Sequence, residues 1–410
     1  MMDSGISTFN GAKAMFYCHD TFGLGHLRRT LTLAKHLRLT APDVSQLIVT
    51  GSPIANRFAF PPGTDYVKLP SVTKNEAGAY EPRSLPGSDM SSVRDMRRDI
   101  LLAAARNFQP DFFIVDHAPG GLQGEAIATL RLLKEEFPET KLIVGLRDIM
   151  DEAATVRKCW SREGVYELFD DLYDLIFVYG NRTFYDVVNE YGLSFRAAEK
   201  TRFVGYLGRE PGARSSADIR ASLDMQTDKL VVVTAGGGGD GRTIFDAMLR
   251  DLQIRDQRDF DCLILGGPLI SDADRAELRT RLGRRGNVHF LDFTDDLPSY
   301  IGAADAVISM GGYNTVCEIL SLNRPALIVP RVQPRQEQLI RATVLSGHGL
   351  VDMIHPRDLE PERLLTSTRE LLARSSNVRP ILTLDGLPNV VTELDSLMSG
   401  AAPATAMRSA

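Results

Sequence analysis

His26 is the residue whose type and position most directly suggest acid–base chemistry. It follows the apolar run AMFYC and a turn that contains Gly23 and Gly25, and it opens the amphipathic segment HLRRTLTLAKHL. Because ligands bind at the carboxyl edge of parallel sheets and an imidazole titrates near neutral pH, His26 is a candidate general base. A helix-capping histidine without a chemical role is the alternative. The adjacent glycines, which let another molecule approach the backbone, and Arg28-Arg29 favour the functional interpretation.

A glycine run in the second half of the chain could bind phosphate. The apolar run LVVVTA leads into Gly236, Gly237 and Gly238, and a helical pattern begins near Thr243. Free backbone N–H groups and a helix N-terminus together favour an anion. The run is neither a Walker motif nor a dinucleotide fingerprint, since it lacks Gly-Lys-Ser/Thr and the next strand has no acidic end. Turn chemistry alone explains the glycines equally well.

The stretch DAVISMGGYNTVCEIL carries a more specific pattern. Gly311 and Gly312 end a predicted strand, and Asn314 or Thr315 is placed to cap the helix that follows. The dipole of that helix would favour a diphosphate. Glu318 lies one turn into the helix, where a carboxylate can accept two hydrogen bonds from a ribose diol. A glutamate at this position is often stabilised only by the dipole, which is the alternative.

Other polar residues at strand ends and helix starts give weaker candidates. Asp116-His117 and Arg147-Asp148 end two predicted strands, where they are either residues of the acceptor side or simple caps. The spacing of Asp272-Ala273-Asp274 suits a divalent cation held against a diphosphate. Because Ser271 or Asp272 precedes a helical segment as a predicted N-cap, we expect no metal site there.

The spacing of apolar runs predicts the scaffold for these residues. Short β-branched runs alternate with amphipathic stretches in both halves, as in βα units on parallel sheets. We therefore predict an N-terminal domain over 14–205, a polar linker over 206–228 and a C-terminal domain over 229–398. Residues 1–13 and 399–410 are predicted to be disordered. One doubly wound domain with a helical appendage is the alternative, but strands occur in both halves.

Residues 70–95 interrupt this rhythm, because they show neither a strand nor a helix period. A loop of this length in a compact domain is usually functional or disordered. A lid over the acceptor and plain disorder both remain open.

Composition limits the function classes. The 410 residues exceed the size of one hydrophobic core, and a net charge of −6 argues against nucleic-acid partners. The four widely separated cysteines form no metal-type pair, so we expect them to be reduced and structural. With no signal-peptide core and no run of roughly 20 apolar residues, the sequence predicts a cytoplasmic protein.

The segment GGYNTVCEIL, then PALIVP, then Glu337-Gln338, resembles the donor-binding segment of certain GT-B glycosyltransferases. These are relatives of the peptidoglycan N-acetylglucosaminyltransferase and the plastid galactolipid synthases, and the resemblance covers nearly the whole C-terminal half. It implies an α/β GT-B fold, with two Rossmann-like domains facing a central cleft. Arg341 stands where this family usually has Asn, so the identities of sugar and acceptor do not carry over.

The resemblance also implies a role for each matching residue. Glu318 would bind the ribose, Gln338 the sugar hydroxyls, and Phe293 with Thr294 would line the base pocket. An ordinary turn in which Asp295-Asp296 caps a helix is the alternative for that last stretch. The residues implied for the two phosphate loops are Gly311, Gly312, Asn314 and Thr315, and Gly236, Gly237 and Gly238.

The first loop, GLGHLRRTLTLA, resembles still more closely the nucleotide-sugar hydrolases of pseudaminic-acid type, which use this histidine to activate water. The leading hypothesis is a metal-independent glycosyltransferase that moves a sugar from a nucleotide-diphospho-sugar, UDP-linked by resemblance, to an acceptor hydroxyl. His26 would be its base, and Arg341 or Arg242 could assist at the diphosphate. Gly23, Gly25, Asp116 and His117 are the acceptor-side candidates.

Two other functions remain open, namely a hydrolase or epimerase of the same fold and a non-catalytic nucleotide-sugar sensor. The expected partners are a nucleotide-sugar donor as co-substrate, with no separate cofactor, and an acceptor of unknown identity. A lipid acceptor would add peripheral contact with a membrane.

Overall fold

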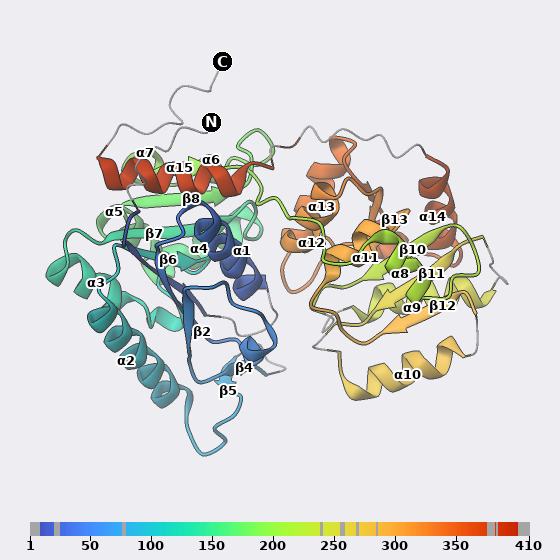
Figure 1. Cartoon of the computed structure of the whole chain (residues 1–410), viewed down its shortest axis with the longest axis horizontal. Coiled ribbons are helices and arrows are strands. Elements are labelled where there is room, and N and C mark those ends of the chain that lie inside the picture. The colour runs from blue at the N-terminus through green and yellow to red at the C-terminus, as the bar shows by residue number, and fades with distance from the viewer. Residues whose placement is uncertain are drawn as a thin grey trace. The chain divides into compact units, whose positions relative to one another are not determined.

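The computed structural model describes residues 9–19, 25–75, 79–237, 241–254, 259–267, 270–283, 286–374, 382 and 384–400. The chain divides into two compact units, one formed by Met1–Leu207 with Asp385–Ala410 and the other by Gly208–Leu384 (Figure 1). Each unit has its own parallel sheet and its own hydrophobic core. The predicted pair of Rossmann-like domains is therefore confirmed.

The first unit is built on a seven-stranded parallel sheet in the order β3-β2-β1-β6-β7-β8-β9. The chain order reverses between β1 and β6, which is the topological switch point where such sheets bind ligands. The strands are β1 (Lys13–Cys18), β2 (Ser45–Thr50), β3 (Thr64–Lys68), β6 (Phe112–Asp116), β7 (Lys141–Arg147), β8 (Leu175–Tyr179) and β9 (Thr201–Phe203).

Helices cover both faces of this sheet because successive strand residues point to opposite sides. Tyr17 and Val115 pack with Leu101 and Leu130 of α2 and α3, whereas Phe16 and Ile114 face α1 and α15. The helices are α1 (Gly25–Thr40), α2 (Met90–Phe108), α3 (Ile127–Glu136), α4 (Ala153–Glu163), α5 (Val165–Asp171), α6 (Val187–Tyr191), α7 (Phe195–Glu199) and α15 (Gly386–Ser399), with short 3-10 turns η1 (Ala55–Arg57) and η2 (Leu122–Gly124).

The 70–95 stretch contains regular structure that its sequence did not reveal. β4 (Val72–Lys74) and β5 (Tyr80–Pro82) pair as an antiparallel hairpin, and α2 begins at Met90 with Asp89 as its N-cap. Three-residue strands are too short to show a period of two. The described residues of this stretch thus contradict the disorder interpretation, while residues 76–78 lie outside the described part.

The second unit is built on a six-stranded parallel sheet in the order β12-β11-β10-β13-β14-β15, which reverses between β10 and β13. Its strands are β10 (Leu230–Thr234), β11 (Asp261–Leu265), β12 (Val288–Leu291), β13 (Ala306–Ser309), β14 (Ala326–Ile328) and β15 (Asp352–Met353). Its helices are α8 (Ser216–Ser222), α9 (Arg242–Ile254), α10 (Asp272–Leu282), α11 (Leu297–Ala303), α12 (Tyr313–Ser321), α13 (Glu337–Gly347) and α14 (Arg363–Ala373), with the 3-10 turn η3 (Pro356–Asp358).

The predicted linker 206–228 is wrong, because from Gly208 onward it belongs to the second unit. It contains α8, whose capping box joins Ser215 and Asp218. The helix buries only Ile219 and is anchored by an ion pair between Arg220 and Asp305 at 2.7 Å. Because α8 is held by polar contacts, its sequence shows no apolar face from which the helix could have been predicted.

The end of the chain also departs from the prediction. The predicted C-terminal domain ran to residue 398, but α15 returns to the first unit, where it packs on α1 (Figure 1). A backbone bridge joins Leu207, where the chain leaves the first unit, to Asp385, where it returns. The Asn389 amide donates to the Val204 carbonyl at 2.8 Å. The sequence showed an amphipathic helix but not the sheet it would cover.

The predicted disorder is wrong for the described residues at both ends. Phe9 is buried and its ring contacts Phe112, with the centroids 5.7 Å apart, so the chain is packed before β1 begins at Lys13. At the other end, α15 extends to Ser399 and Gly400 is its C-cap. Residues 1–8 and 401–410 lie outside the described part.

Candidate active site

His26 lies at the switch point of the first sheet, on the first turn of α1 beside the end of β6. Its Nδ1 is 2.6 Å from Oδ2 of Asp116, the last residue of β6. The two residues are 90 positions apart, and only the adjacency of β1 and β6 brings them together. A carboxylate on Nδ1 fixes the tautomer that carries its proton there, which leaves the Nε2 lone pair to accept a proton.

Arg29 holds the carboxylate of Asp116 in this position. Its Nε donates to Oδ1 at 2.6 Å and its Nη2 to Oδ2 at 2.5 Å, and the side chain is almost fully buried. Nη2 of Arg29 also lies 3.2 Å from Nδ1 of His26. Because a guanidinium can only donate, the Nδ1 proton of His26 goes to the closer carboxylate.

Asp116 remains ionised despite its burial. Burial alone raises the pKa of a carboxyl group, but the charge of Arg29 and the hydrogen bond with His26 outweigh it and lower the pKa of Asp116 to about 2. A carboxylate that is charged at neutral pH can stabilise the imidazolium that His26 becomes when it takes a proton.

Two further histidines contact the His26 ring. The ring centroids of His19 and His117 lie 4.5 and 4.9 Å from that of His26, which restricts the imidazole from two sides. His117 has a φ of 71°, a left-handed backbone that is costly for a residue with a side chain, and its N–H donates to the Gly145 carbonyl at 2.8 Å. His117 also lies 3.4 Å from Nη2 of Arg147.

The remaining acceptor-side candidates separate into different roles. Gly25 is the first residue of α1, whereas Gly23 lies outside the described residues. Asp148 is buried and accepts a hydrogen bond from the Tyr206 hydroxyl at 2.9 Å, so its position is explained by the fold. Tyr179 was not predicted. Burial and the nearby charge of Asp116 raise its pKa, and a Cβ at Gly145 would collide with its hydroxyl.

In the second unit, the two predicted phosphate loops meet at the switch point between β10 and β13. A Cβ built on Gly236, which follows β10, would lie 3.5 Å from Oγ1 of Thr315 on α12. Gly267 packs against the Gly236 loop, since a Cβ on Gly267 would lie 2.7 Å from the Gly236 carbonyl oxygen. Gly237 is described, and Gly238 lies outside the described residues.

The amino end of α12 differs from the predicted cap. The N-cap is Gly312, and no described side chain caps it, because the helix begins at Tyr313 and places Asn314 and Thr315 inside its first turn. Gly312 has no side chain with which to cap this turn, and the amino end of a helix favours an anion.

Arg209 adds a positive charge at this helix end. Its Nη2 donates to Oδ1 of Asn314 at 2.9 Å, and its backbone N–H donates to the Ser321 hydroxyl at 2.8 Å. Sequence reasoning missed this residue because the segment around it looked like a featureless linker.

Gly311 and Arg341 shape the turn that leads into α12. Gly311 has a φ of 79°, and a Cβ there would lie 2.8 Å from Ile328, so the position requires glycine. Arg341, on α13, is buried; its Nη1 donates to the Gly311 carbonyl at 3.1 Å, and its guanidinium lies over the Tyr313 ring. Arg341 therefore braces the loop.

Two predicted sugar and ribose ligands lie on α12 and α13. Glu318 is 1% exposed, one and a half turns into α12. Gln338 is also buried, and its Oε1 accepts from the Arg331 backbone N–H at 3.0 Å, which fixes the orientation of the amide.

The predicted base-pocket residues follow β12. Phe293 and Thr294 are half-buried, and the Thr294 hydroxyl accepts from the Asp296 N–H at 3.0 Å. Asp296 is the N-cap of α11 by position, but its carboxylate binds the Ser299 hydroxyl and the Ala213 N–H instead of capping the helix.

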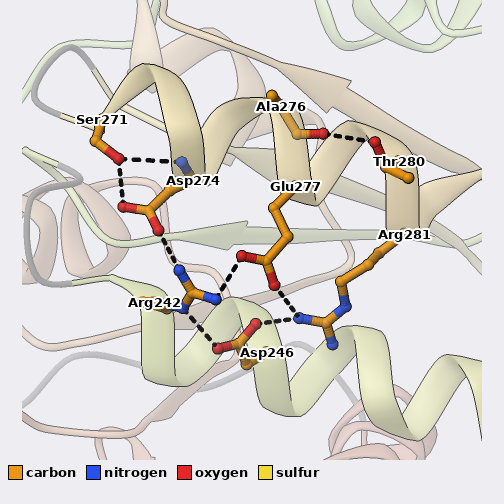
Figure 2. A network of polar contacts seen from close by, with 8 residues as sticks. All are labelled: Arg242, Asp246, Ser271, Asp274, Ala276, Glu277, Thr280 and Arg281. Atoms are coloured by element: carbon orange, nitrogen blue, oxygen red, sulfur yellow. Dashed lines mark hydrogen bonds and ion pairs between the residues drawn. The ribbon is translucent and has the colours of Figure 1, made fainter.

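Arg242 is held away from a phosphate role by carboxylates. It pairs with Asp246 of its own helix and with Asp274 and Glu277 of α10, as Figure 2 shows. Ser271 is the N-cap of α10, as predicted, and Asp274 also accepts from its hydroxyl at 2.6 Å. The carboxylates of the Asp-x-Asp sequence are thus used in capping and ion pairs. Within the described ranges, no cluster of three or more His, Cys, Asp or Glu residues could hold a metal ion.

Comparisons with known proteins agree with this architecture. Residues 231–380 match the glycosyltransferase family 28 C-terminal domain. A UDP-N-acetylglucosamine--N-acetylmuramyl-(pentapeptide) pyrophosphoryl-undecaprenol N-acetylglucosamine transferase from Shouchella clausii is 27% identical over 192 residues, which is 46% of this chain and 52% of the relative. The chain thus spans about half the length of the curated relatives it matches.

Solved structures match over nearly the whole chain. A putative UDP-N-acetylglucosamine 2-epimerase from Listeria monocytogenes has a TM-score of 0.61 at 14% identity, covering 95% of this chain and 98% of that one. MurG from Acinetobacter baumannii has a TM-score of 0.54 at 14% identity, covering 95% and 99%.

Two Rossmann-like units, each with a parallel sheet whose strand order reverses once, together with these structural matches, define the GT-B fold. The chain is thus a GT-B protein. Residues 231–380 of its second unit match the family 28 glycosyltransferase C-terminal domain, and this match together with the Shouchella clausii relative bears out the predicted resemblance to the peptidoglycan N-acetylglucosaminyltransferases.

Proposed function

We propose that the protein transfers a sugar from a uridine-diphosphate-linked donor to an acceptor hydroxyl, without a metal ion. His26 takes the hydroxyl proton on Nε2, the acceptor oxygen forms a bond to the anomeric carbon, and the bond to the diphosphate breaks. A single displacement of this kind inverts the anomeric configuration. The observation that carries the proposal is the hydrogen bond of 2.6 Å between His26 and Asp116 at a switch point.

The second unit would hold the leaving group. The amino end of α12, the Gly236 loop and the guanidinium of Arg209 would all face negative charge on the diphosphate. Glu318 would bind the ribose and Gln338 the sugar hydroxyls, with Phe293 and Thr294 beside the base. A positive side chain and backbone donors would then replace a metal.

The relatives support the uridine donor, since the Shouchella clausii protein is named for UDP-N-acetylglucosamine. Its named acceptor is linked to pyrophosphoryl-undecaprenol, so we propose that a lipid-linked acceptor would bring this protein to a membrane surface as a peripheral protein. In the described part of the chain, no helix is long and apolar enough to cross a bilayer. The four cysteines, all of them described, form no disulfide with one another, which supports our proposal of a cytoplasmic location.

Titration calorimetry with a panel of nucleoside diphosphates, followed by turnover assays with UDP-sugars, tests the proposal. We expect UDP to bind best, turnover to persist in EDTA, and His26→Ala to lower kcat roughly 10²- to 10⁴-fold with donor affinity nearly unchanged. No binding of any nucleoside diphosphate would refute the proposal. Loss of turnover in EDTA, restored by manganese, would refute its metal-free form.

A hydrolase or epimerase is the second candidate, because the His26 loop resembles that of nucleotide-sugar hydrolases and the fold also matches an epimerase. Assaying the donor alone and then with lipid, glycan and small-molecule acceptors separates these functions. Fast hydrolysis that no acceptor changes favours the hydrolase, a 2-epimer product favours the epimerase, and a glycosylated product favours the transferase.

A further inference from the structure

The first unit contains a buried ion pair between Arg97 and Glu125. Arg97 of α2 donates from Nε to Oε2 of Glu125 at 2.7 Å and from Nη2 to Oε1 at 2.6 Å, and both side chains are 0% exposed. The hydroxyl of Tyr17, which is buried on β1, also donates to Glu125. The proposed reaction uses none of these three side chains.

The same guanidinium binds two backbone carbonyls near the site. Nη2 of Arg97 donates to the carbonyl of His19 at 3.3 Å, and Nη1 donates to that of Pro70 at 2.7 Å. His19 is the residue after β1, and Pro70 precedes the β4-β5 hairpin. Arg97 therefore joins the end of the strand that leads to His26 to the start of the hairpin segment.

Tyr17 and Glu125 extend the connection to a third segment. The Tyr17 hydroxyl accepts from the N–H of Leu122 at 3.2 Å, and Glu125 follows the η2 turn that Leu122 begins. Burial, followed by the negative charge of Glu125, raises the pKa of Tyr17, so this hydroxyl remains a donor. Since η2 follows β6, the network reaches the segment after Asp116 and His117 as well.

Stability alone does not account for such a pair. The cost of desolvating two charges roughly cancels their attraction, and well-packed apolar side chains often serve a core equally well. The pair instead fixes backbone positions: Arg97 binds the carbonyls of His19 and Pro70 directly, and Glu125 holds the Tyr17 hydroxyl that accepts from the Leu122 N–H. The His19 ring in turn contacts the His26 ring, with 4.5 Å between the centroids.

We propose that Arg97 and Glu125 are positioning residues for the base, acting through the His19 carbonyl and the segment after β6. This inference rests on the proposed function, because it assumes that His26 takes the acceptor proton. Without the pair, the chain still contains His26 and Asp116. The segments at His19, at Pro70 and after β6, which align these two residues with an acceptor, are then no longer held together by one ion pair.

The double variant Arg97→Met with Glu125→Leu tests this proposal, because it removes both charges and leaves no buried charge unpaired. We expect a folded protein with unchanged donor affinity and donor KM, a kcat lowered roughly 10- to 100-fold, and an altered pH profile of kcat. A role in stability alone would change the melting temperature without changing that profile. The matched control is Arg202→Met with Glu393→Leu, a partly buried pair between the edge strand β9 and α15, which should leave kcat unchanged.

Arg97→Lys is the second variant, in case the double variant does not fold. It keeps a charge opposite Glu125 but cannot bind both carboxylate oxygens, His19 and Pro70 together, so kcat should still fall severalfold. Wild-type kcat and pH profile in either folded variant would overturn the positioning role alone. Wild-type protein that turns over no nucleotide-sugar would instead refute the proposed function.

Discussion

Asp116 is the residue on which the chemistry of His26 depends. Asp116→Asn should lower kcat roughly 10²- to 10⁴-fold, because an amide can donate to Nδ1 and so shift the imidazole proton to Nε2, where the base is needed. Steady-state kinetics with calorimetric donor binding would show a loss in kcat and little change in Kd. Asp111→Asn is the control, because Asp111 lies at the other end of β6, just before its first residue, and accepts from the Lys13 N–H. An Asp116→Asn protein with wild-type kcat would exclude the pair as the base.

The low pKa of Asp116 also has a consequence for stability. A carboxyl group with a depressed pKa stabilises the folded state above its unfolded pKa, about 3.9, and loses that contribution as the pH falls towards its folded value. With a folded pKa of about 2, the contribution of Asp116 is lost between about pH 4 and pH 2. Urea melts across this range should therefore show a smaller pH dependence for Asp116→Asn than for wild type. Equal slopes would contradict the depressed pKa.

Glu318 is the residue that tests the ribose site. Glu318→Gln keeps the shape of the side chain but removes the charge, so UDP affinity should fall roughly tenfold or more, as expected for hydrogen bonds to a charged group. Asp251→Asn is the contrasting variant, because Asp251 is a buried carboxylate that accepts from the N–H groups of Glu362 and Leu365 at the start of α14. It should lower the melting temperature and leave UDP affinity unchanged. The reverse pattern would assign Glu318 to the fold.

At the scale of elements, apolar runs of five or more residues were visible in the sequence, and short polar-anchored elements were not. The apolar run in FFIVD predicts β6, and all five residues of that strand are buried. The β4-β5 hairpin and α8 escaped detection, since their strands have three residues and α8 buries only Ile219. His26 was identified as a candidate from its loop, but its pairing with Asp116 depends on strand order, which local pattern does not encode.

The start of α15 packs so closely on the first unit that it leaves no room for a side chain at Gly386. A Cβ on Gly386 would lie 2.6 Å from the Gly205 carbonyl oxygen and 2.7 Å from that of Tyr206, so the helix would have to move away from the chain it binds. Gly386→Ala should therefore destabilise the first unit by about 1–3 kcal/mol in chemical denaturation. Gly302→Ala in α11 is the control, because a Cβ there meets no atom within 4 Å and should be neutral or stabilising. Similar effects of the two variants would argue against tight docking of α15.

At the scale of the whole molecule, the chain passes from the first unit to the second after Leu207 and returns before Asp385. The second unit is therefore one continuous segment, and the first is assembled from two segments far apart in sequence. Local periodicity could not reveal this arrangement, because the apolar stripe of α15 would suit either sheet. The candidate donor residues Gly236, Thr315 and Glu318 all belong to the continuous unit.

A fragment of residues 208–384 should consequently fold alone and bind UDP about as tightly as the full chain, since its sheet and core come from within it. A fragment ending at residue 207 should fold poorly, because it lacks the side chains Leu387 and Val390 that face Phe16 and Leu37. Supplying residues 385–400 by co-expression should restore a cooperative melt, and a full chain truncated after Gly400 is the control, expected to melt like wild type. Circular dichroism and calorimetry measure these outcomes. A stable 1–207 fragment would show that α15 is dispensable, and a folded 208–384 fragment that fails to bind UDP would show that the donor site needs residues of the first unit.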